Sequence, residues 1–79
     1  MDHYTRLVET AVAIAVSGIL NEIERELERS KGNPDECKAL RRIGRYILKE
    51  FEGVGPRGGV YGAARFAQLF SEENEQRSP

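Results

Sequence analysis

Residues 11–20 read AVAIAVSGIL, and this stretch decides the fold because it is apolar on almost every side of the helix it is expected to form. Apolar residues recur around it at three- and four-residue spacings, which indicate a helix rather than the strict alternation of a strand. One series is Val8, Val12, Ala15 and Ile19, and a second is Ala13, Val16, Leu20, Ile23 and Leu27. Its β-branched residues favour a strand locally, but good helix formers flank it on both sides. We therefore predict a helix over about residues 3–30, with Asp2 as its N-cap.

A helix that is apolar all round needs more than one covering surface. Because the rest of this short chain offers little to cover it, the hypothesis is a homo-oligomer, most simply a two-fold dimer, with the first helix at its centre. The residues expected between subunits are Val12, Ala15, Val16 and Ile19. The apolar run is about half of the ~20 residues that a bilayer requires, so no membrane partner is predicted.

The clearest local signal is the start of a second helix at Asn33-Pro34-Asp35-Glu36. Asn33 is a typical N-cap, Pro34 suits the first helical position, and Glu36 completes a capping box. We predict this helix over residues 34–52. Gly44 lies in its middle, where a glycine is unfavourable, so we expect another backbone to cross closely there.

Four glycines and a proline between residues 53 and 59 end the second helix. A third, shorter helix is predicted over residues 60–70, and residues 71–79 are interpreted as a disordered polar tail. The fold prediction is therefore an all-α single domain over residues 1–70. It is a three-helix bundle with a long first helix, and homo-oligomerisation is expected to complete it.

Composition excludes several classes of protein. The chain has 79 residues and one cysteine, Cys37, so neither an internal disulfide nor a cysteine-based zinc site is expected. A free thiol and no recognisable signal peptide favour a cytoplasmic location. His3 is the one histidine and lies near the N-terminus, and no nucleophile, base and oxyanion donor come together. We predict no catalytic residues, no metal, no cofactor and no enzyme activity.

Charge is unevenly placed along the chain. Residues 1–36 carry eight acidic and four basic side chains, whereas residues 37–70 carry two acidic and seven basic ones. Within the second helix, Lys38, Arg42, Arg45 and Lys49 follow a four-three-four spacing that predicts a basic stripe on one side. The stripe is suited to phosphates. It equally fits a solvated helix face or a charge-paired contact with another subunit.

The Gly-rich loop is the most specific functional pattern. Residues 53–58 fit G-x-G-x-x-G, but a helix rather than the strand of a dinucleotide-binding unit precedes them. Residues 55–58 resemble the G-x-x-G loop of KH domains, whose strands are not predicted here. Backbone N–H groups of glycines before a helix attract anions, and an arginine adds charge. The predicted phosphate-binding residues are Gly55, Arg57, Gly58, Gly59, Tyr61 and Arg65, with a purely structural connection as the alternative.

Two functions remain open from the sequence. The first is a small regulatory protein that binds a nucleotide or nucleic acid at the Gly-rich loop and the basic stripe. The second is a protein–protein interaction module, an adaptor or inhibitor, without such a ligand. Because the formal net charge is −1, long duplex DNA is the weaker form of the first hypothesis.

Overall fold

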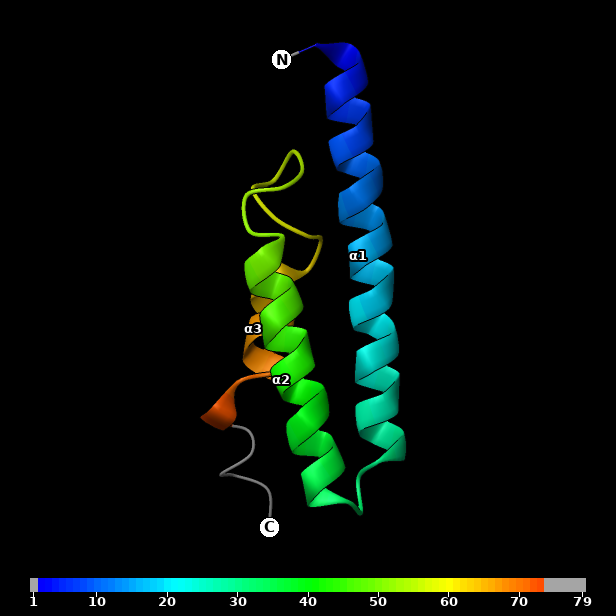
Figure 1. Ribbon diagram of the computed structural model, residues 1–79, viewed down its shortest axis with the longest axis vertical. Helices are drawn as coiled ribbons and strands as arrows, with labels where there is room; N and C mark the ends of the chain where they lie inside the picture. Colours follow the sequence, from blue (N-terminus) through cyan, green and yellow to red (C-terminus); the bar gives the residue numbers. More distant parts are fainter. Residues whose placement is uncertain (1, 74–79) are drawn as a thin grey trace.

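A computed structural model describes residues 2–73, and this part of the chain is all-α (Figure 1). It contains the helices α1 (His3–Arg29), α2 (Pro34–Glu50) and α3 (Ala63–Leu69), and no strand occurs within residues 2–73. The all-α prediction with three helices is thus confirmed. The molecule is elongated, with extents of 49 × 19 × 15 Å. Among the described helices, none is both long and apolar enough to cross a membrane.

The two N-caps expected from the sequence are present. The Asp2 carboxylate accepts a hydrogen bond of 2.7 Å from the Thr5 N–H, and this bond lowers the pKa of Asp2. The Asn33 side chain accepts one of 3.1 Å from the Glu36 N–H, with Pro34 in the first turn of α2. Both caps satisfy N–H groups that have no partner inside the helix.

The later boundaries differ from the prediction. Helix α2 ends at Glu50 rather than 52, and α3 begins at Ala63 rather than 60. The reason for the late start is Gly62, whose φ of 77° is left-handed and cannot belong to a right-handed helix. Of the predicted tail, residues 71–73 are described and Glu72 contacts Arg45, with 3.7 Å between their charged atoms. The remaining tail residues, 74–79, lie outside the described part.

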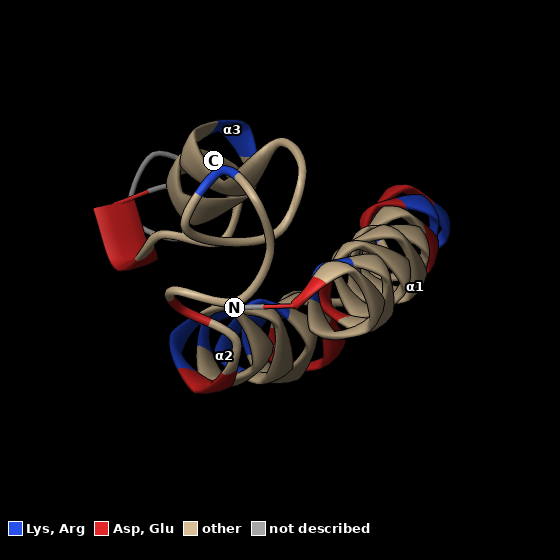
Figure 2. Cartoon of the chain, turned by 90° about the horizontal axis from the view of Figure 1, so that it is seen from above, with Lys and Arg blue, Asp and Glu red and all other residues tan. Residues whose placement is uncertain are grey.

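The core lies where α2 packs against both α1 and α3 (Figure 2). Its buried members are Val16, Leu20, Ile23, Leu27, Cys37, Val60, Phe66 and Phe70. The Cys37 thiol donates to the Ser30 carbonyl at 3.1 Å. Cys37 therefore satisfies an acceptor at the end of α1 and also packs in the core. Gly44 is buried where Phe70 approaches α2, so the close contact at this glycine is made by an aromatic side chain rather than by the second backbone expected from the sequence.

Candidate functional site

One side of α1 faces away from α2 and α3 and is exposed along its apolar part, and we call it the outer face. All its residues are exposed, and all but the terminal Tyr4 are aliphatic or small. They are Tyr4, Leu7, Val8, Ala11, Ile14, Ala15, Gly18 and Ile19. Ile14 is 59% exposed and Ile19 is 51% exposed, although aliphatic side chains of this size are usually buried. The helix is therefore apolar on two opposite sides.

The opposite side of α1 supplies the core and includes Val16, one of the four residues predicted between subunits. Val16 is only 5% exposed because it packs inside its own chain, together with Leu20 and Ile23. It belongs to the series that begins at Ala13, whereas the sequence prediction places it between subunits. Val12 lies half-buried at the edge of this core. Ala15 and Ile19, the other two predicted interface residues, do lie on the outer face.

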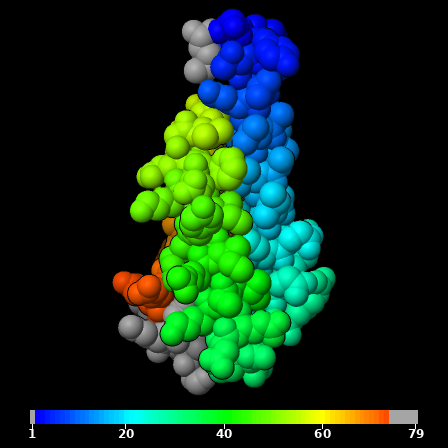
Figure 3. All heavy atoms as spheres, in the orientation of Figure 1, coloured from blue at the N-terminus to red at the C-terminus, as the bar shows by residue number. Residues whose placement is uncertain are grey.

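The first turns of α1 have no support from the rest of the described chain. Residues 3–8 are exposed, and this end of α1 extends past α2 and the loop (Figures 1 and 3). An isolated helical segment of this length is marginal in water.

The sequence prediction missed most of the outer face. A signal for it was present, because Tyr4, Val8, Ala11, Ala15 and Gly18 follow a continuous four-three spacing that indicates a helix–helix contact.

The Gly-rich loop closes on itself and rests on α1. The Gly53 N–H donates to the Gly58 carbonyl at 2.9 Å, and the Gly58 N–H donates to the Gly55 carbonyl at 3.2 Å. Gly55 has a φ of 100°, and a Cβ there would lie 2.9 Å from the Cβ of Ala13. Gly55 is thus needed for the close approach of the loop to α1. Ser17 on α1 also lies within hydrogen-bond distance, 3.1 Å, of the Tyr61 carbonyl.

The two predicted phosphate-binding arginines have different surroundings. The Arg65 guanidinium makes a two-pronged ion pair with Glu24 of α1, with distances of 2.9 and 3.1 Å, and lies over the Phe66 ring. The hydrogen bonds from Arg65 lower the pKa of Glu24, and those to Glu24 raise the pKa of Arg65. Arg57 is exposed and lies over the Tyr61 ring at 5.6 Å. The exposed Arg57 side chain can therefore contact a ligand, whereas the Arg65 side chain is held by its ion pair with Glu24.

The basic stripe on α2 is interrupted at its third member. Lys38, Arg42 and Lys49 are exposed, but Arg45 is half-buried and donates a hydrogen bond of 2.6 Å to the Phe70 carbonyl. It also pairs with Glu72. Arg45 thus satisfies the carboxyl end of α3, where an unpaired carbonyl and the helix dipole attract a cation.

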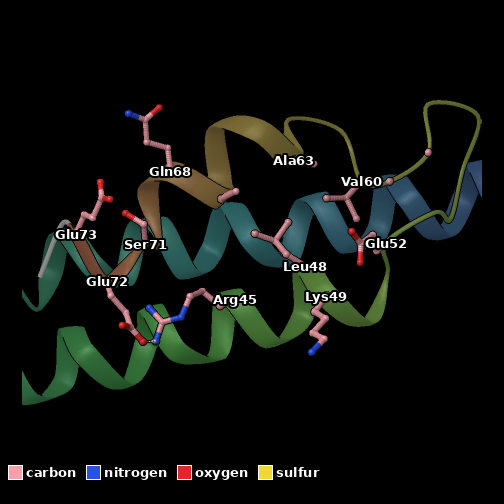
Figure 4. Close-up of a pocket in the computed structure, with 13 residues that line it drawn as sticks. Arg45, Leu48, Lys49, Glu52, Val60, Ala63, Gln68, Ser71, Glu72 and Glu73 are labelled. Carbon is pink, nitrogen blue, oxygen red and sulfur yellow. Dashed lines mark ion pairs between the residues drawn. The ribbon is translucent and has the colours of Figure 1, made fainter.

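An open groove of about 1050 Å³ lies between α2 and α3 (Figure 4). Its apolar lining includes Leu48, Val60 and Ala63. The groove brings together Gly58, Gly59, Arg45 and Lys49 of the predicted site. The other predicted residues, Arg57, Tyr61, Arg65, Lys38, Arg42 and Gly55, do not line it. Three carboxylates, those of Glu52, Glu72 and Glu73, outnumber the two basic side chains, so the groove does not favour anions.

Within residues 2–73 no group of three or more His, Cys, Asp or Glu side chains is placed to hold a metal ion. Comparison with protein-family models, with curated proteins and with solved structures found no match to this chain. Function must therefore be argued from the chemistry of the outer face, the Gly-rich loop and the groove.

Proposed function

We propose that this protein is a non-enzymatic helical interaction module that binds another polypeptide through the outer face of α1. The observation that supports this is the length of apolar helix left exposed, from Tyr4 to Ile19. Scattered single apolar residues are normal on a protein surface, whereas a contiguous apolar patch marks a site of interaction. This ranks the interaction module above the phosphate-binding protein.

The energetics of the outer face favour a partner. Complete burial of a Leu or Ile side chain stabilises by about 1.5–3 kcal/mol, so covering one that is half exposed contributes about 1 kcal/mol. Leu7, Val8, Ile14 and Ile19 each fall near this case. Burial of all four side chains would offset part of the free-energy cost of association, which is about 4–15 kcal/mol for the translational and rotational freedom that is lost. The partner must bring apolar side chains of its own.

Photo-crosslinking in cells tests the proposal. A photoreactive phenylalanine analogue in place of Ile14 should give discrete crosslinked products, because Ile14 lies in the middle of the outer face. The same analogue in place of Ile43, an exposed apolar residue of α2 that is 49% accessible, is the matched control. Equal and diffuse labelling from both positions would contradict a specific interaction through α1.

A second candidate function is binding of a nucleotide or nucleic acid at the Gly-rich loop. It is favoured by Arg57, which is exposed and has no carboxylate partner among residues 2–73. The N–H groups of Gly55, Arg57 and Gly59 donate no hydrogen bond within the same range. Such groups bind phosphate oxygens. Opposing it, Arg65 and Arg45 are both engaged inside the chain.

A further inference from the structure

We propose that the partner of the outer face is a second copy of this chain, with the two α1 helices packed antiparallel. This inference rests on the proposed function and names its partner. The predicted three-helix bundle would thereby be completed by a helix from another subunit.

The layout of small and large residues on the outer face suits contact with a copy of itself. Ala11, Ala15 and Gly18 lie along its centre, and larger aliphatic side chains border this line on both sides. Small residues at the centre let two helix backbones approach closely, while the larger residues pack around the contact. A face with this layout fits a copy of itself, as a two-fold interface requires.

The distribution of charge decides the orientation. Beyond Ile19, the outer face continues as Glu22, Arg25, Glu26 and Arg29, which form ion pairs within α1. A parallel pair would place Glu22 beside Glu22 of the second copy, and like charges at such close positions repel. An antiparallel pair centred on the apolar part leaves both charged segments outside the contact, at opposite ends.

The antiparallel arrangement also covers the unsupported start of α1. With the contact centred between Tyr4 and Ile19, Tyr4 of one copy lies opposite Ile19 of the other, and Val8 lies opposite Ala15. The exposed turns at residues 3–8 then pack on the part of α1 that is anchored to α2. Eight residues a side are fewer than the 20–30 of a standard interface, so we expect a dissociation constant in the micromolar range.

Sedimentation equilibrium over a range of concentrations tests self-association. The wild-type chain should change from monomer to dimer as the concentration passes through the micromolar range. Leu7→Glu and Ile14→Glu should each weaken the dimer by about a hundredfold, because each buries an unpaired carboxylate. Both residues are exposed in the single chain, so the circular dichroism of the dilute variants should stay helical. Ile43→Glu, on α2, should dimerise normally.

Spin labels at a Glu22→Cys substitution, in a Cys37→Ser background, test the orientation. In the antiparallel pair the two labels lie about 30 Å apart, since each is about ten residues from the centre at 1.5 Å per residue. In a parallel pair they lie near the interaxial distance of about 10 Å. A short distance would overturn the antiparallel arrangement.

The outcomes separate this inference from the proposed function. A wild-type chain that stays monomeric at every concentration, while Ile14 crosslinks to a different protein in cells, would overturn self-association and leave the interaction module standing. A monomer with no specific crosslink from Ile14 would overturn both. Dimerisation that Leu7→Glu and Ile14→Glu leave intact would place the contact elsewhere and contradict the inference.

Discussion

The aromatic ring of Phe70 packs directly against the backbone of Gly44. A Cβ on Gly44 would lie 2.5 Å from Cδ2 of Phe70 and 2.7 Å from Cγ and Cε2 of the same ring. Phe70 is fully buried and stacks on Phe66, with ring centroids 5.7 Å apart. The ring therefore has little freedom to move aside. This one contact explains a glycine in the middle of α2 and fixes the end of α3 on that helix.

Gly44→Ala should therefore destabilise the protein, although alanine is the better helix former by up to about 1 kcal/mol. Forcing one extra methyl group into a packed core typically costs about 1–3 kcal/mol. We expect a net loss in the free energy of unfolding, measured by urea titration followed by circular dichroism.

Gly18→Ala is the matched control for this substitution. Gly18 also lies inside a helix, but a Cβ there meets nothing within 4 Å. At concentrations below dimerisation it should stabilise the chain by about 0.5–1 kcal/mol. If Gly44→Ala raised the free energy of unfolding by the same amount, this would contradict the close packing of Phe70 on α2.

Asn33→Ala should lower the free energy of unfolding by about 1 kcal/mol, because it removes the side-chain acceptor at the start of α2. Thermal unfolding of the dilute protein measures the effect. Asn33→Asp is the control, since a carboxylate accepts the same hydrogen bond from the Glu36 N–H and should keep most of the stability. An unchanged melting temperature for Asn33→Ala would contradict a capping role.

The ion pair of Glu24 with Arg65 predicts a specific dependence on pH. Because the hydrogen bonds from Arg65 lower the pKa of Glu24 from its ordinary value of 4.5, the pair stabilises the folded chain fully above that value. Its contribution is lost as the pH falls through the lower pKa of the folded state. Glu24→Gln should reduce stability at pH 7 by about 0.5–1 kcal/mol, as expected for a partly exposed pair.

Urea titrations at neutral and acidic pH measure this dependence. The difference between wild type and Glu24→Gln should shrink as the pH falls below 4.5. Glu28→Gln is the control, since Glu28 forms its ion pair within residues 2–73 with the exposed Lys31, at 3.6 Å. A difference that stays constant across this range would show that Glu24 acts through packing instead.

Val16→Glu should unfold the chain rather than merely separate subunits. Val16 lies in the core of the single chain, and an unpaired carboxylate there is not tolerated. The far-ultraviolet circular dichroism of the dilute variant should lose most of its helical signal. If the variant were instead a folded monomer, this would favour the sequence prediction that Val16 lies between subunits.

Local chemistry made much of the fold predictable. Asp2 and Asn33 have the side chains that cap helices, and the series from Ala13 to Leu27 has the spacing of a buried helix face. The partners of Arg45 and Arg65 were not predictable, because Phe70 and Glu24 are 25 and 41 residues away along the chain. Spacing alone also shows that α1 has two apolar sides, but only the position of α2 decides which one is the core.

Arg57→Ala tests the phosphate-binding candidate. If the Gly-rich loop binds a phosphate, this substitution should weaken binding by about 1.5–3 kcal/mol, the usual value for a charged hydrogen bond, without lowering stability. Stability should be unaffected because Arg57 is exposed, lies over the Tyr61 ring and has no ion pair within residues 2–73. Titration of the dilute protein with nucleotides and short oligonucleotides, at two salt concentrations, measures the affinity.

Gly58→Val separates a binding loop from a structural one. Gly58 has a φ of 76°, so a β-branched residue there is strained even though a Cβ would meet nothing within 4 Å. A structural loop should lose stability with Gly58→Val and show no response to Arg57→Ala. A binding loop should lose affinity with both variants, and for an oligonucleotide the remaining affinity should fall as salt rises. Wild-type affinity for every phosphate ligand after removal of Arg57 would leave the loop as the connection that lets Gly55 pack on Ala13 of α1.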